Sequence, residues 1–295
     1  MTKKKNPKTE PAYLAGAVKD AYECLLNGLG ESHIMTFRMK YTLTCRYFNE
    51  KMYEELYQLT EGMTDEAVSR LDELEDADNF FDIITFRLVS CVETGRFDEA
   101  IAEGEKTLPI LRKKFRADVI ELANYSILLC DAYMGKGMYA EGEKLLKKAI
   151  AKMDEEDIPA SEPIYCTAAI NWAGCLNALG RVVTAREVLD DLRLLIDEEK
   201  DENEDYILED LADSSEDAPP AFIDFLSAGI AGVITDFAYE KLGSRKPFTF
   251  SSILKDVQNS PELESKLFDL ASEFSYLVDP EGDEEEFLPY PDEED

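Results

Sequence analysis

The chain has 295 residues, and 45% of them are apolar, so it can bury a sizeable core. Its formal net charge is −33, from 64 acidic residues against 31 Lys and Arg. A field this negative repels phosphate, which argues against direct binding of nucleic acid or of an anionic membrane. The six cysteines lie in apolar helical patterns without a C-x-x-C pair, and no secretory signal is recognised. These features favour a reducing, cytoplasmic location.

The first part of the chain predicts helices behind a short tail. Residues 1–10 are expected to form a disordered basic tail. The spacing of apolar residues over 11–28 predicts a helix that caps an incomplete repeat. A second helix runs to about Asn49, and its partner begins near Lys51. The pattern leaves open whether this partner continues as one helix to about residue 74 or breaks at Gly62.

Three later stretches share one pattern of an apolar helix, a glycine and a second apolar helix. The turn glycines are Gly95, Gly137 and Gly180, which are 42 and 43 residues apart. A fixed period of this size predicts stacked repeats, in which neighbouring helix pairs bury each other's apolar stripes. An earlier repeat has Lys51 at the turn position. The predicted repeat domain therefore covers residues 11–197.

Two prolines add predictions about individual helices of the repeats. Pro109 lies within the second helix of the repeat at about 77–116 and predicts a kink near residues 106–109. In the repeat at about 161–197, Ser161 is predicted to cap a first helix that has Pro163 in its first turn.

The composition changes after residue 197. Residues 198–220 are acidic and predict a linker or long loop. Residues 221–242 predict an apolar helix, and a buried helix is favoured over a membrane span because acidic residues leave about 11 uninterrupted residues of the ~20 that a span needs. With helices at 250–258 and 260–277, this helix is predicted to cap the repeats over residues 221–278. Residues 279–295 predict an acidic disordered tail with an aromatic island at 287–291.

Several motifs carry a family resemblance. Residues 95–101, Gly-Arg-Phe-Asp-Glu-Ala-Ile, resemble the tetratricopeptide repeat (TPR) signature. The period exceeds the usual ~34 residues and is similar to that of kinesin-light-chain-type repeats. Residues 29–36 match the Leu-Gly-x-x-His-Pro-x-Thr of those repeats except for Ile34, and residues 171–173 resemble their Asn-Leu-Ala. The resemblance covers about residues 29–197. It implies an all-α, right-handed α-solenoid of stacked antiparallel helix pairs with C-terminal capping helices.

Catalytic chemistry is not indicated. His33 is the only histidine and fits a turn between helices, so a histidine-based metal site is excluded. The sequence contains no phosphate-binding loop, dinucleotide fingerprint or nucleophile elbow. We therefore predict a non-enzymatic protein with no catalytic residue, no cofactor and no metal.

The resemblance implies that the first helix of each repeat lines a concave partner-binding groove. The outward polar positions that this implies are Arg38, Tyr41, Asp82, Thr85, Asn124, Asp131, Thr167 and Asn177. The alternative is that these residues form only the solvated face of their helices. The favoured hypothesis is a scaffold or adaptor that holds a peptide or partner helix of another protein in this groove.

Three other hypotheses stay open. An acidic, chaperone-like holder would bind a basic client through the runs 198–217 and 279–295, which carry 11 and 10 acidic residues. Such binding should weaken steeply with salt, whereas groove binding should survive deletion of 279–295. Alternatively, the island at 287–291 would occupy the chain's own groove, or the acidic runs would serve only solubility.

Overall fold

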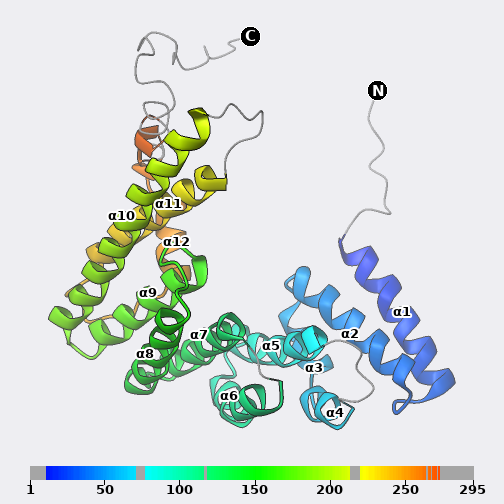
Figure 1. The fold of residues 1–295 in the computed structure, drawn as a ribbon. Helices are drawn as coiled ribbons and strands as arrows, with labels where there is room; N and C mark the ends of the chain where they lie inside the picture. Colours follow the sequence, from blue (N-terminus) through cyan, green and yellow to red (C-terminus); the bar gives the residue numbers. More distant parts are fainter. Residues whose placement is uncertain are drawn as a thin grey trace, which may run out of the picture. The chain divides into compact units, whose positions relative to one another are not determined.

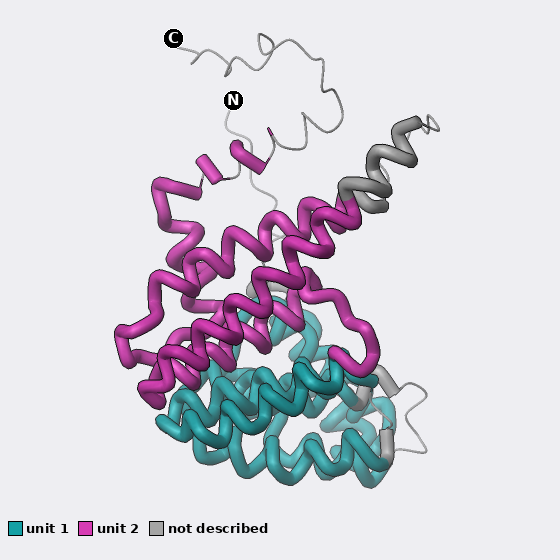
Figure 2. The backbone as a smooth tube through the Cα atoms, turned by 60° about the vertical axis from the view of Figure 1, so that its left-hand side comes forward, with its two compact units in different colours: residues 1–153 teal, residues 154–295 magenta. Residues whose placement is uncertain are grey.

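The computed structural model describes residues 11–70, 77–115, 118–212 and 220–272, except 264, 267 and 271. These described residues form helices and no strand (Figure 1). The chain divides into two compact units, residues 1–153 and 154–295 (Figure 2). The predicted tails at 1–10 and 279–295, with the island at 287–291, lie outside the described residues.

Unit 1 is built from helices that pack with their neighbours in the chain. Helix α2 packs with α1 and α3, α5 with α6, and α7 with both α5 and α6. This is the arrangement expected of successive helix pairs that share one core. The elements are α1 (Pro11–Leu29), α2 (Ile34–Asn49), α3 (Tyr53–Leu59), α4 (Met63–Ser69), α5 (Ala77–Glu93), α6 (Phe97–Ile110), the π-helix η3 (Leu111–Phe115), α7 (Val119–Gly135) and α8 (Tyr139–Glu155), whose last two residues belong to unit 2.

In unit 1 the structure decides the open question at Gly62 and shows where the helix containing Pro109 becomes irregular. The partner of α2 breaks at Gly62, whose left-handed backbone (φ 67°) separates α3 from α4. Helix α6 continues through Pro109, and the irregularity follows it as the π-helix η3. Proline has no N–H for the bond one turn back, so a change of helix type next to it is physically reasonable.

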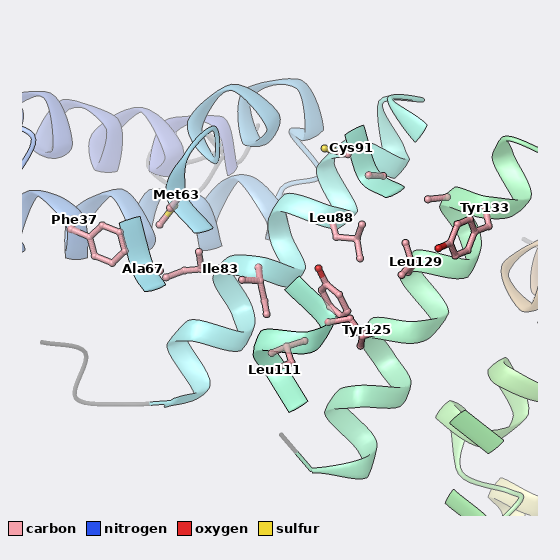
Figure 3. Close-up of a cluster of buried hydrophobic side chains, with 14 residues drawn as sticks. Phe37, Met63, Ala67, Ile83, Leu88, Cys91, Leu111, Tyr125, Leu129 and Tyr133 are labelled. Atoms are coloured by element: carbon pink, nitrogen blue, oxygen red, sulfur yellow. The ribbon is translucent and has the colours of Figure 1, made fainter. Parts of the chain in front are cut away.

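A continuous apolar cluster runs through unit 1. Figure 3 shows its side chains following one another from Phe37 on α2, past Met63 on α4 and Ile83 on α5, to Leu129 on α7. Phe37 and Leu129 are each 1% exposed, and Met63 and Ile83 are fully buried. Each helix pair therefore completes its core with side chains of the next, as the repeat hypothesis requires.

Unit 2 contains α9 (Pro163–Ala178), α10 (Val182–Ala212), α11 (Pro220–Glu240) and α12 (Phe250–Gln258). Helix α10 packs on α9 and α11, while α11 and α12 each pack on α9 and on each other. The fourth helix pair is thus covered by α11 and α12, which are the expected capping helices. The bounds of α12 agree with the prediction, and the described residues from 263 to 272 are helical within the helix predicted at 260–277.

The predicted linker at 198–220 is wrong for residues 198–212, which continue α10. No glycine or proline occurs between Gly180 and Pro219, and Glu has a good helix propensity, so the acidic composition alone does not end the helix. Glu199 accepts hydrogen bonds from the backbone N–H groups of Ala160 and Ser161. Ser161 is not the N-cap of α9; that position is Glu162, whose side chain makes no capping bond.

Helix α11 is apolar but does not meet the length and apolarity that a membrane-spanning helix needs. Among the residues described, no helix is long and apolar enough to cross a bilayer. Phe225 and Ala238 on α11 are fully buried in the protein itself.

Candidate partner-binding surface

Four equivalent turns fix the register of the four helix pairs. Lys51, Gly95, Gly137 and Gly180 all have left-handed backbones, with φ of 57°, 74°, 74° and 77°. At each turn the N–H of this residue bonds to the carbonyl three residues back, and the next N–H bonds to the carbonyl five residues before it. This is the Schellman pattern that ends a helix with a left-handed residue. Residues at equal distances before the turns are therefore structurally equivalent.

This register groups four of the predicted site residues. Arg38, Asp82, Asn124 and Thr167 each lie thirteen residues before a turn residue, on α2, α5, α7 and α9. Arg38 and Asn124 are exposed, and Asp82 and Thr167 are half-buried. The hydroxyl of Thr167 donates to the carbonyl of Pro163 on its own helix. In unit 1, three successive first helices thus present an accessible polar side chain at one position.

Tyr41 and Asp82 are joined to each other. The Tyr41 hydroxyl donates to Oδ2 of Asp82 at 2.7 Å, which links α2 to α5. Burial, and then this hydrogen bond, raise the pKa of the Tyr41 hydroxyl above its ordinary value. Burial likewise raises the pKa of the Cys45 thiol one turn further along α2. The Tyr41 hydroxyl and the Cys45 thiol are therefore neutral contacts at neutral pH.

Asp131 and Glu93 place two carboxyl groups near one another on α7 and α5. Burial, and then the charge of Glu93, raise the pKa of Asp131 from 3.8 to about 7. Asp131 is half-buried and Glu93 is exposed. A cationic side chain approaching this pair would favour the ionised form of Asp131.

Thr85 is a weaker candidate than the sequence suggests. The residue is half-buried on α5, but its hydroxyl oxygen is inaccessible and has no hydrogen-bond partner among the residues that the structure describes. A buried hydroxyl in this state cannot be reached by a partner without movement of its surroundings.

Asn177 is not a groove residue, and its predicted outward position is wrong. The residue is fully buried, because the loop between α11 and α12 covers it. Its Nδ2 donates to the Lys246 carbonyl at 2.8 Å and to the Ser244 hydroxyl at 3.2 Å, and its Oδ1 accepts from the N–H of Gly243 at 2.9 Å. The side chain is therefore saturated by groups of the chain's own loop.

The same loop covers two residues of α9 that the sequence did not single out as a site. Oδ1 of Asn171 accepts from the N–H of Phe250 at 2.7 Å. A Cβ at Gly174 would overlap the carbonyl oxygen of Phe248. Asn171, Gly174 and Asn177 recur every three residues, so one face of α9 is closed by residues 243–250. Gly174 was the sequence feature that could have indicated this contact, since a glycine inside a helix often marks a close approach of another backbone segment.

The accessible surface of unit 1, which we call the first-helix face, lies on α2, α5 and α7. It combines polar positions with Val89 and Leu128, so an amphipathic segment could pack on it. Its exposed or half-buried residues are Arg38, Cys45, Asp82, Val89, Glu93, Asn124, Leu128 and Asp131.

The described part of the chain contains no cluster of metal ligands. No group of three or more His, Cys, Asp or Glu side chains there could hold a metal ion. His33 is the N-cap of α2, and its Nδ1 accepts from the N–H of Met35 at 3.1 Å. This histidine has the structural role that its place in the sequence suggested.

Comparison with known proteins gives matches to structures only. The sequence matches no protein-family model and no curated protein. A variant of a Podosopora anserina protein, described as a kinesin light chain with nearly identical TPR-like repeats, is 17% identical with a TM-score of 0.52; the match covers 63% of this chain and 86% of that one.

Two further structures have lower TM-scores. Another crystal structure of the Podosopora anserina protein is 16% identical over 77% of this chain and 99% of that one, with a TM-score of 0.46. BtubC (BKLC) from P. vanneervenii is 13% identical over 87% of this chain and 94% of that one, with a TM-score of 0.48. The consecutive helix pairs, their equivalent turns and the similarity at a TM-score of 0.52 show that this chain has a TPR-like repeat fold.

Proposed function

We propose that this chain is a non-enzymatic scaffold that holds a peptide or partner helix of another protein on the first-helix face of unit 1. The TPR-like repeat fold supports a protein-interaction role in general. The observation that carries the finer proposal is the recurrence of Arg38, Asp82 and Asn124 at one register of three successive helices. A periodic row of side chains suits an extended or helical segment, which is itself periodic.

The covered face of α9 restricts the proposed site. Residues 243–250 already bind Asn171 and Asn177, so a partner is not expected to use that face. We therefore place the site on α2, α5 and α7, and we withdraw Thr167 and Asn177 from it. Asp82 is expected to contribute together with Tyr41, because their hydrogen bond holds both side chains in place.

The proposal is tested by placing a large side chain on the first-helix face. In Asn124→Trp, an exposed polar residue of α7 is replaced by a large ring. The matched control is Ala102→Trp, which adds the same ring at an exposed position of the second helix α6. Proteins captured from extract of the native cell by the unchanged chain should be lost with Asn124→Trp and kept with Ala102→Trp. Equal capture by all three chains would refute the site.

A second candidate, an acidic holder of a basic client, is favoured by Glu93 and Asp131. Burial, and then the charge of Glu93, raise the pKa of Asp131, and a Lys or Arg of a partner would relieve the repulsion between the two carboxyl groups. Capture by this mode should fall steeply between low and physiological salt and should decrease when residues 279–295 are deleted. Capture that survives both changes but fails with Asn124→Trp would favour the scaffold instead.

A further inference from the structure

Unit 2 carries a small group of basic residues in a sequence that is otherwise strongly acidic. Five of the nine Lys and Arg residues between positions 154 and 295 fall in two short segments. Arg181 and Arg186 lie at the start of α10, while the loop after α11 supplies Lys241, Arg245 and Lys246. The two segments meet, because Asn177 at the end of α9 binds this loop and the Arg186 guanidinium lies 5.9 Å from the centre of the Tyr239 ring.

The loop is held in a defined shape. The loop is bonded to Asn177 at several points. Arg245 has a left-handed backbone (φ 55°), which is unfavourable for a residue with a side chain and persists only where the surrounding contacts hold it. Lys241 is paired with Asp256 at 2.6 Å. Arg245 and Lys246 are exposed and form no ion pair among the described residues. The fold therefore presents two adjacent cations that form no direct ion pair with its described residues.

Two exposed apolar side chains follow Asn177, the residue that binds the loop carrying these cations. Leu179 and Val183 belong to the turn that follows Asn177, and they are 39% and 73% exposed. We call the surface formed by Leu179, Val183, Arg245 and Lys246 the basic end. A ligand that fits it needs both carboxylates and an apolar group.

We propose that residues 279–295 of the same chain dock on the basic end. This segment contains ten acidic residues and no basic one, and its sequence Phe-Leu-Pro-Tyr-Pro at 287–291 supplies the apolar group. The acidic residues on both sides of the island would face Arg245 and Lys246, and the island would pack on Leu179 and Val183. Charge and hydrophobicity are thus complementary in both partners.

The segment can reach this surface. Lys266 pairs with Asp236 at 3.3 Å, and Leu270 packs against Gly229, so the chain runs back along α11 away from Lys241. From Gly229 to Lys241 the helix measures about 18 Å. Twelve residues can span at most about 40 Å, so the chain from 272 to 284 is long enough to cover this distance. A tether of this length gives an effective concentration of roughly millimolar, so a weak contact suffices.

Protease protection in the full-length monomer tests the proposal. Chymotrypsin should cleave after Phe287 roughly fivefold more slowly in the full chain at low salt than in a free peptide of residues 279–295, since docking removes the bond from the protease. The variant Arg245→Glu/Lys246→Glu should be cleaved at the peptide's rate. The control Lys144→Glu/Lys148→Glu makes the same charge change at exposed positions of α8 and should keep the protection.

A charge reversal on both sides tests whether the loop variant loses protection because it unfolds or because its charges no longer attract the segment. Adding Glu284→Lys, Glu285→Lys and Glu286→Lys to the Arg245→Glu/Lys246→Glu chain should restore slow cleavage. Unchanged helix content by circular dichroism would show that the loop variant still folds. Cleavage of the full chain at the peptide's rate, protection that persists in the loop variant, or protection that appears only in dimers would each overturn docking within one chain.

Discussion

Gly243 and Asn177 lie 66 residues apart in sequence and are joined by a hydrogen bond of 2.9 Å from the glycine N–H to Oδ1 of the asparagine. The other end of the same amide group donates to the carbonyl of Lys246 at 2.8 Å. One side chain therefore closes the loop between α11 and α12 onto α9. An amide suits this position because it offers both a donor and an acceptor.

Asn177→Ala is expected to lower the free energy of unfolding of unit 2 by about 1–3 kcal/mol, since the buried amide and the partly buried loop groups that it binds lose their hydrogen bonds. Asn177→Asp should be similarly harmful, because its carboxylate would face the Lys246 carbonyl. Asn124→Ala, at an exposed asparagine of α7, should change stability by less than about 0.5 kcal/mol. Hydrogen exchange of the Gly243 amide measures the effect locally. An unaltered exchange rate in Asn177→Ala would show that the loop is held by other contacts.

Gly174→Ala tests how closely the loop approaches α9. The added methyl group would overlap the carbonyl oxygen of Phe248, which belongs to the backbone and cannot turn aside. We expect a loss of about 3 kcal/mol or more, or release of the loop from the helix. The control is Gly16→Ala in α1, where no atom lies within 4 Å of the new Cβ, and this change should stabilise unit 1 by about 1 kcal/mol. Thermal unfolding distinguishes the two substitutions, and equal stability of both variants would contradict the close approach.

The sequence was sufficient to predict the helix pairs and their register, because the period of 42–43 residues is carried by local features. A left-handed turn residue and an apolar stripe are recognisable in any one repeat. Even Lys51, which departs from the glycine pattern, adopts the same backbone as Gly95. These features depend on neighbours a few residues away, and such neighbours are visible in a sequence.

The surroundings of Asn177 could not be predicted in this way. Met134 and Val92 occupy the equivalent register position on α7 and α5, and nothing near Asn177 indicates that a loop 66 residues later covers it. The continuation of α10 escapes prediction for a different reason. A high density of acidic residues is typical of a loop, yet charge alone does not end a helix that contains no glycine or proline.

Lys51→Gly is expected to stabilise unit 1 by about 0.5–1 kcal/mol. A side chain in the left-handed region crowds the following carbonyl, and glycine removes this cost at the expense of a more flexible unfolded chain. Gly95→Ala is the reciprocal change and should destabilise by about 1 kcal/mol, since no neighbouring atom hinders the new Cβ and only the backbone opposes it. Urea denaturation measures the free energy of unfolding of both variants. Changes of the same sign would contradict the equivalence of the two turns.

Asp131 is expected to make unit 1 less stable as the pH rises. Its pKa is about 7 in the folded chain, against an ordinary value of 3.8, because burial and the charge of Glu93 disfavour ionisation. Between these values the folded state binds more protons than the unfolded state, so the favourable contribution is full below about pH 4 and is lost as the pH rises through about 7. Since Asp131 is only half-buried, we expect a loss of about 2 kcal/mol between about pH 5 and pH 8, less than the full shift would give.

Asp131→Asn isolates this carboxyl group from all others that titrate in the same range. The amide has nearly the same size and does not ionise, so the variant should exceed the unchanged chain in stability at about pH 8 and approach it at about pH 5. Glu93→Gln should have a smaller effect of the same direction, because it removes only the second cause of the raised pKa. Urea unfolding followed by circular dichroism at both pH values measures the difference. If the stability of Asp131→Asn depends on pH as strongly as that of the unchanged chain, another group must carry the titration. The first-helix face would then remain negatively charged at neutral pH, and a partner's cation would release no proton from Asp131 when it binds.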